Sequence, residues 1–135
     1  MLLSEKDRET KSWLGIAKSD LGAGQSLCTH ETFSTQAAFF AQQAAEKVIK
    51  GFLVWHQVRF KKDHDIRYLG NLALEKDGAL REVIDEAVAL NPFAVTFRYP
   101  GEDVGLSIDD ASEALKIAEK LFDEILTKLP AEVHP

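Results

Sequence analysis

The sequence predicts an all-α protein, an up-and-down bundle of four or five helices that forms one domain over residues 1–135. Long stretches without proline carry apolar residues three or four positions apart, the period that gathers them on one face of a helix. No run alternates like a half-buried strand; "FAVTF" (93–97) is long enough for a strand but has no partner. With 45% hydrophobic and 28% charged residues, the composition is that of a globular domain.

The first helix is predicted to begin at Ser4, whose hydroxyl can cap it, with Asp7 three residues on in a near capping-box arrangement. Two glycines, Gly22 and Gly24, weaken its apolar stripe, so the sequence does not fix where this helix ends. The stripe consists of Trp13, Ile16, Ala17, Leu21 and Leu27.

The second helix, from about Phe33 to Gln57, gives the clearest pattern. Its apolar residues step by three or four positions: Ala37, Ala41, Ala44, Val48, Phe52 and Trp55, widened by Ala38, Ala45, Ile49 and Leu53. The polar residues of the opposite side are Gln43, Glu46, Lys47 and Lys50. Because alanines let neighbouring helices approach closely, we expect this to be the central helix of the bundle. We expect Trp13 and Trp55 in the core or in a dimer interface.

Two shorter helices follow. Asp65 is the expected N-cap of a third helix from Ile66 to about Leu74, and Asp77-Gly78 then breaks the chain. A fourth helix is marked by Leu80, Val83, Ile84, Ala87 and Val88. Asn91-Pro92 is expected to close it.

The last helix is predicted after a loop over residues 93–105, which contains Pro100 and shows no helical period. Ser107 with Asp110 three positions on indicates the start of this helix, and Pro130 its end. Its apolar stripe consists of Ile108, Ala111, Leu115, Ala118, Phe122, Ile125 and Leu129. This stripe and that of the second helix exceed what one small core needs, which favours a homodimer.

The charge is unevenly distributed. The chain has 16 basic and 22 acidic residues, a net charge of −6, yet the segment from Glu46 to Arg67 carries +3. Its cations are Lys47, Lys50, Arg59, Lys61, Lys62 and Arg67. An acidic chain argues against indiscriminate nucleic-acid binding, where phosphate neutralisation dominates affinity. A local basic patch can still bind one phosphate-bearing ligand; the alternative is a solvated helix end and turn.

The expected compartment is the cytoplasm. A single cysteine, Cys28, allows no internal disulfide, the polar N-terminus does not resemble a signal peptide, and no apolar run has the length of a membrane span. No histidine or cysteine spacing suggests a metal site, and no glycine-rich phosphate loop is present. We therefore expect neither a metal nor a cofactor.

Four strings in this order resemble the HEPN domain family over about residues 10–127: "AKSDLGAG" (17–24), "AAFFAQQAAEKVIKGFLV" (37–54), "HDI" (64–66) and "FRYPG" (97–101). The resemblance implies a helical bundle that is usually a homodimer. Many members are encoded beside a small nucleotidyltransferase, as the toxin half of a toxin–antitoxin pair. Active members resemble metal-independent ribonucleases with an Arg-x(4–6)-His motif before the last helix.

At the family's motif position this sequence has Arg98, but no histidine follows until His134. The spacing does occur in "RFKKDHD" (59–65), between Arg59 and His64, yet that lies between the second and third helices. The weak catalytic candidates are therefore Arg98, for phosphate charge, and His64, as the base. His64 also reads as a turn histidine.

Two functions follow from these residues. The first is a binding module, the partner of a small nucleotidyltransferase, that recognises this protein or a nucleotide or RNA phosphate. The second is a metal-independent endoribonuclease with an unusual arrangement of its groups. The missing motif histidine favours the first. The candidate ligand-binding residues are Lys47, Lys50, Arg59, His64, Arg98 and Tyr99. For Lys47 and Lys50 a charged surface is the alternative, and for Tyr99 a structural loop.

Overall fold

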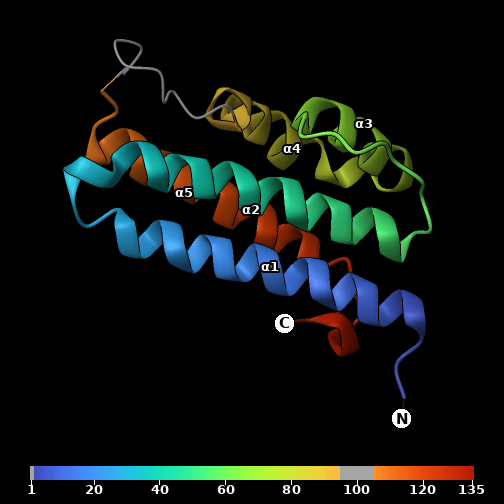
Figure 1. The fold of residues 1–135 in the computed structure, drawn as a ribbon. Coiled ribbons are helices and arrows are strands. Elements are labelled where there is room, and N and C mark those ends of the chain that lie inside the picture. The colour runs from blue at the N-terminus through green and yellow to red at the C-terminus, as the bar shows by residue number, and fades with distance from the viewer. Residues whose placement is uncertain (1, 95–104) are drawn as a thin grey trace.

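The computed structural model of the chain describes residues 2–94 and 105–135, and within these ranges it contains helices and turns but no strand. The described α-helices are α1 (Glu5–Leu27), α2 (Ser34–Trp55), α3 (Ile66–Lys76), α4 (Arg81–Ala87) and α5 (Ile108–Leu126) (Figure 1). Short 3₁₀ turns lie between them, namely η1 (Glu31–Phe33), η2 (Gly78–Leu80) and η3 (Val88–Ala94), and η4 (Ala131–Val133) follows α5. The predicted all-α bundle is confirmed.

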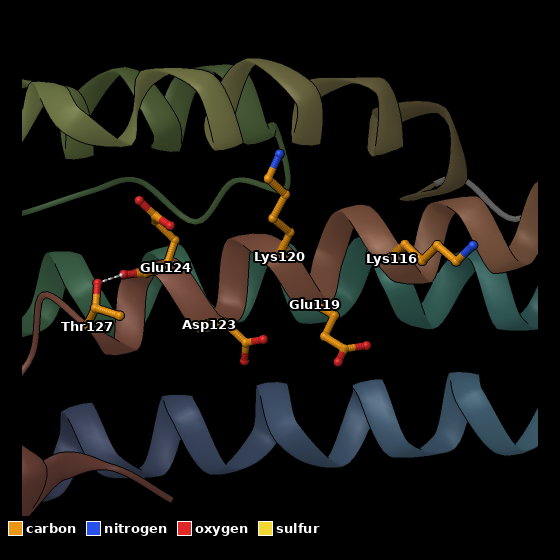
Figure 2. Close-up of a pocket in the computed structure, with 6 residues that line it drawn as sticks. All are labelled: Lys116, Glu119, Lys120, Asp123, Glu124 and Thr127. Carbon is orange, nitrogen blue, oxygen red and sulfur yellow. Dashed lines mark hydrogen bonds between the residues drawn. The ribbon is translucent and has the colours of Figure 1, made fainter.

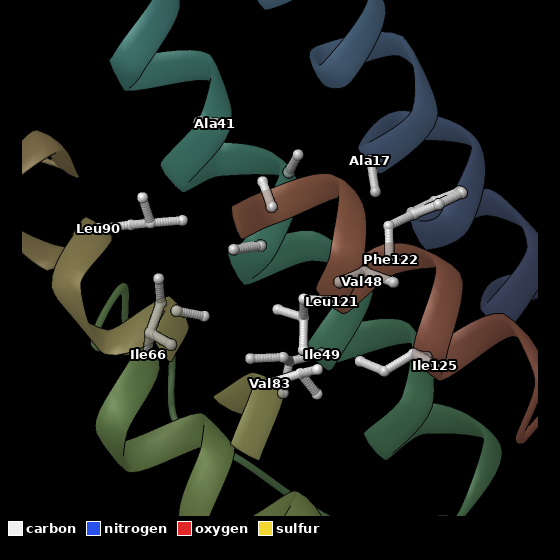
Figure 3. Packing of buried hydrophobic residues seen from close by; sticks show 14 of the residues in the cluster. Ala17, Ala41, Val48, Ile49, Ile66, Val83, Leu90, Leu121, Phe122 and Ile125 are labelled. Carbon is white, nitrogen blue, oxygen red and sulfur yellow. The ribbon is translucent and has the colours of Figure 1, made fainter. Parts of the chain in front are cut away.

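Helix α2 is the centre of the bundle, as its apolar pattern predicts. It packs against α1 and α5 along its length and against α3 and η3 on another side. Figure 1 shows α1, α2 and α5 running alongside one another, with α3 and α4 above α2. The buried side chains of these helices form one apolar cluster, part of which Figure 3 shows. Its α2 members include Ala37, Ala41, Ala44, Ala45, Val48, Ile49 and Phe52, all without exposed surface.

The predicted helix caps are all present. Ser4 Oγ accepts a hydrogen bond from the Asp7 N–H at 3.0 Å, and Asp65 Oδ1 accepts from the Arg67 N–H at 2.9 Å. Ser107 and Asp110 form a complete capping box, with bonds of 3.0 and 3.1 Å. These side chains satisfy backbone N–H groups that have no partner inside the helix, so the chain signals its helix starts locally.

The first helix differs from its prediction in register. Leu14 is fully buried, whereas Ile16, placed in the apolar stripe, is 46% exposed. The helix runs on through both glycines to Leu27. Space at Gly24 is tight, because a Cβ there would lie 2.6 Å from Leu115 Cδ2 on α5 and 3.2 Å from the backbone oxygen of Ala37 on α2. That glycine therefore permits a close helix approach and does not end the helix.

The segment after α4 also differs. Helix α4 ends at Ala87, but the chain continues as the 3₁₀ turn η3 through Pro92 to Ala94. The prediction that Asn91-Pro92 closes the helix is therefore wrong, and Phe93 and Ala94, placed in the predicted loop, belong to η3. Proline fits this turn because its fixed φ is helical. The remainder of the predicted loop, residues 95–104, lies outside the described residues.

None of the helices that the structure describes combines the length and apolar composition needed to cross a membrane.

Gly70 tests the packing of α3 on α4. A Cβ at this position would overlap Ile84 Cγ2, the branched part of a fully buried side chain that cannot swing away. We expect Gly70→Ala to lower the free energy of unfolding by about 1–3 kcal/mol. Gly22→Ala is the control, since nothing lies within 4 Å of its Cβ position; it should raise stability by about 0.5–1 kcal/mol. Denaturant unfolding measures both, and equal effects would contradict the packing.

Candidate functional site

A buried carboxylate, Glu46, lies at the middle of α2 with its side chain 1% exposed. Its Oε2 atom accepts hydrogen bonds from Lys50 Nζ at 2.9 Å and from Lys47 Nζ at 3.3 Å. Its Oε1 atom lies 2.9 Å from His64 Nδ1 and 3.5 Å from Gln42 Nε2. Both oxygens are thus occupied. We call Gln42, Gln43, Glu46, Lys47, Lys50 and His64 the Glu46 cluster.

Two glutamines extend the cluster along α2. The buried Gln42 donates from Nε2 to the backbone carbonyl of His64 at 3.2 Å, and its Oε1 accepts from Gln43 Nε2 at 2.6 Å. Gln43 Oε1 in turn accepts from Lys47 Nζ at 2.8 Å. Residues three and four apart on a helix face the same way, which is how one helix supplies five of the six members.

Lys50 is held on three sides. Besides its bond to Glu46, its ammonium lies 5.6 Å from the ring centroid of Trp13 on α1 and 5.9 Å from that of Phe60 in the connection after α2. Cations are attracted to aromatic faces, most strongly where water is excluded. Only 8% of the Lys50 side chain is exposed. Trp13, expected in the core or an interface, is partly buried here.

The expectation of a solvated polar face on α2 is therefore wrong for Glu46 and Lys50. The connection, residues 56–65, does not leave the bundle but folds back along α2 as far as Glu46. Together with α1 it covers the polar face that the helical period places opposite the apolar stripe. The backbone N–H of Lys61 donates to Tyr68 Oη at 3.0 Å, which fixes the connection against α3.

The charges of the cluster compensate one another. Burial is the largest influence on the pKa of Glu46 and raises it, but hydrogen bonds from Lys50 and His64 and the charges of both lysines outweigh it, so the pKa is lowered. On α1, burial raises the pKa of Asp20, opposed by Lys47 and reinforced by Glu46. Two carboxylates thus face two ammonium groups.

His64 reaches furthest into solvent, with 74% of its side chain exposed. Because the ionised Glu46 can only accept, Nδ1 must carry the hydrogen that joins them. Nε2 then faces away from the carboxylate, and no hydrogen bond to it is present within residues 2–94 and 105–135. A histidine oriented by a carboxylate in this way can exchange a proton with a ligand.

The other candidates lie elsewhere. Arg59 lines a separate hollow of about 550 Å³ between the start of α1 and the end of α2, with Lys6, Glu5 and Glu9. Arg98 and Tyr99 lie outside the described residues. His134, the first histidine after Arg98, has its Nε2 2.9 and 3.1 Å from two carbonyl oxygens at the end of α5.

A shallow depression of about 430 Å³ on the outer face of α5 has little chemistry to offer. Figure 2 shows its charged side chains on one helix, pointing in different directions. Lys120 is already paired with Glu86 of α4 at 3.2 Å. Nor does any described part of the chain bring together three side chains suited to hold a metal ion.

The sequence analysis does not identify three residues at or beside the cluster: Gln42, Asp20 and Phe60. For Gln42 the sequence does contain a usable signal, because this polar residue lies between Ala38 and Ala45 in an otherwise apolar stripe, one turn before Glu46. Asp20 and Phe60 carried none, because their places depend on how α1 and the connection pack against α2.

Comparison with known proteins gave one result. The family model of the HEPN domain matches residues 10–129. Neither the curated proteins nor the solved structures contain a match to the chain.

Removing the central charge tests whether the cluster holds the fold. Glu46→Gln keeps the shape but leaves the ammonium of Lys50 buried without a carboxylate, so we expect a loss of about 3–5 kcal/mol in unfolding free energy. Glu46→Leu with Lys50→Met should recover most of it, because an apolar pair needs no partner. Lys120→Ala, which breaks an exposed pair, should change little. Denaturant unfolding compares them, and a Glu46→Gln variant as stable as wild type would refute the structural role.

Proposed function

The chain belongs to the HEPN domain family, and on that premise we propose that it is a binding module and not a nuclease. It acts as the partner of a small nucleotidyltransferase in a toxin–antitoxin-type pair, in the cytoplasm. The Glu46 cluster provides a patch that recognises a phosphate group of a nucleotide or RNA.

The main observation in favour of a binding role is that the motif position of the catalytic base holds no histidine. No histidine follows Arg98 until His134, and the Nε2 atom of His134 lies against carbonyl oxygens at the end of α5. A nuclease of this kind needs a group that removes the proton of the 2′-hydroxyl. The chain retains Arg98, a cation that can bind phosphate, and lacks the histidine that would act with it.

The members of the cluster that reach solvent support a phosphate patch. The side chain of Lys47 is 17% exposed and that of His64 74%. Lys61 and Lys62, both exposed, lie in the same connection as His64. Lys50, buried against Glu46, serves to orient the carboxylate and does not contact the ligand. Arg59, Arg98 and Tyr99 remain as further proposed contacts.

The proposed assembly is a homodimer. Large apolar side chains at the surface support it: Ile16 on α1 is 46% exposed and Phe33 in η1 is 41% exposed. Two aromatic side chains on these helices are partly buried: Trp13 on α1, and Trp55 at the end of α2 opposite Phe33.

Lys47 tests the phosphate patch. If its ammonium contacts a phosphate, Lys47→Ala should weaken binding of ATP or of single-stranded oligouridylate about 10- to 100-fold, the worth of one hydrogen bond to a charged group. Lys18→Ala, an exposed lysine of α1, is the matched control and should bind as wild type does. Titration calorimetry measures both, and sedimentation of the same samples reports the dimer. Equal binding by Lys47→Ala and wild type would reduce Lys47 to a structural residue.

A metal-independent endoribonuclease is the second candidate. The observation in its favour is His64, exposed and held 2.9 Å from a carboxylate as a general base would be. Arg98 would then stabilise the phosphate charge. Arg98 lies outside the described residues, so no distance between Arg98 and His64 supports this function.

An assay separates the two functions. We expect no cleavage of single-stranded RNA by the purified protein in EDTA at neutral pH, because loss of a general base typically costs about 10²–10⁴-fold. Cleavage that resists EDTA, and that His64→Ala and Arg98→Ala each abolish while both variants stay folded, would establish the nuclease. Cleavage that survives both substitutions would indicate a contaminating enzyme.

A further inference from the structure

The orientation of His64 is fixed at two points. Nδ1 lies 2.9 Å from Glu46 Oε1, and the backbone carbonyl of His64 accepts a hydrogen bond from Gln42 Nε2 at 3.2 Å. Glu46 and Gln42 are both buried on α2, the most enclosed helix of the bundle. The imidazole therefore presents Nε2 outward, although most of the ring is in solvent.

Glu46 accepts a hydrogen bond from His64 but does not readily remove its proton. Its second oxygen already takes hydrogen bonds from two ammonium groups, at 2.9 and 3.3 Å, which stabilise the ionised carboxylate. Nδ1 thus keeps its hydrogen whether the ring is neutral or charged. The neutral ring offers a lone pair at Nε2, and the charged ring offers an N–H. A phosphate oxygen can accept a hydrogen bond from the second and is repelled by the first.

We propose that His64 makes phosphate binding at the Glu46 cluster proton-linked: the ring takes up one proton when a phosphate oxygen binds at Nε2, so binding tightens as the pH falls. This rests on the proposed function, because it presumes that the cluster binds phosphate at all. It adds that acidity regulates the site, because a ring that binds a phosphate oxygen at Nε2 must carry a hydrogen there.

Lys61 and Lys62, in the same connection as His64, are exposed. Several other charged groups near the ring are engaged. From α2, Lys47 and Lys50 are bonded to Glu46. Within the connection, Asp63 Oδ1 accepts from the Asp65 N–H at 2.9 Å. Asp65 Oδ1 accepts from the Arg67 N–H and from Asn91 Nδ2 of η3, each at 2.9 Å.

Two further groups complete the surroundings. Arg67 of α3 pairs with Asp85 of α4 at 2.9 Å. Asp20 of α1, whose pKa burial raises, interacts with Lys47 and Glu46. Ionisation of Asp20 would also weaken anion binding as the pH rises, so the test must separate it from His64.

The test uses two probes whose own charge is constant across the range: oligouridylate without terminal phosphates, and inorganic sulfate. We expect wild-type affinity to rise by up to about tenfold per pH unit as the pH falls, the limit for one linked proton. At one pH, calorimetry in two buffers of different ionisation enthalpy should show proton uptake. Binding of sulfate alone would identify a free phosphate as the ligand, and binding of oligouridylate an RNA backbone.

Variants assign the proton. His64→Gln keeps an amide that can reach Glu46 but cannot take up a proton, so it should bind more weakly and equally at every pH. His30→Gln, at an exposed histidine beside η1, should keep the wild-type dependence. Thermal melts monitored by circular dichroism establish that both fold, and the two-buffer calorimetry of the wild type stands without either variant.

Two results would overturn the inference and leave the proposed function intact: wild-type binding that is independent of pH, or a pH dependence that His64→Gln retains, which would assign the proton to a group other than His64. Failure of both probes to bind at any pH would overturn the phosphate-binding function and the inference together.

Discussion

The structure depends on how one buried charge is compensated. Glu46 lies on α2, the helix against which α1, α3, α5 and η3 pack, and 1% of its side chain is exposed. An unpaired carboxylate in such a place would lower the free energy of unfolding by roughly several kcal/mol. Its partners come from the same helix, through Lys47 and Lys50, and from outside it, through His64. The neutralisation of this charge therefore fixes the path of the connection between α2 and α3 as well as the state of the carboxylate.

The packing around α2 explains why a polar cluster can lie so deep. Alanines on its apolar side let α5 and α1 approach, and Gly24 allows α1 to meet Leu115 of α5. The apolar side is then fully used, and the polar side is covered from α1 by Trp13 and from the connection by Phe60. The groups of the cluster that reach solvent, Lys47 and His64, are oriented by their hydrogen bonds to the buried Glu46.

The parts of the fold that local chemistry determines could be predicted. Ser4, Asp65 and Ser107 cap helices because their side chains satisfy nearby backbone N–H groups, and the sequence contains that whole interaction. The register of α1 could not, because Leu14 and Ile16 are equally apolar and the choice between them is made by α2 and α5. The sequence singles out Lys47, Lys50 and His64 as candidate ligand-binding residues. Their gathering around Glu46 and the burial of Lys50 depend on a connection that folds back, which no local pattern specifies.

If the cluster binds an anion as we propose, the balance of charge limits which of its groups can contact that anion. Lys50 and Lys47 both donate to Glu46 Oε2, and Lys50 is nearly enclosed. A phosphate that drew Lys50 away would leave Glu46 buried with less compensation, at a cost comparable to that of breaking a buried ion pair. Contact with an anion must therefore come from groups that can move while the charge of Glu46 stays compensated. Lys47 satisfies that condition in part, because Glu46 would keep Lys50. His64 satisfies it fully, since its outward nitrogen can meet a ligand while the inward one stays on the carboxylate.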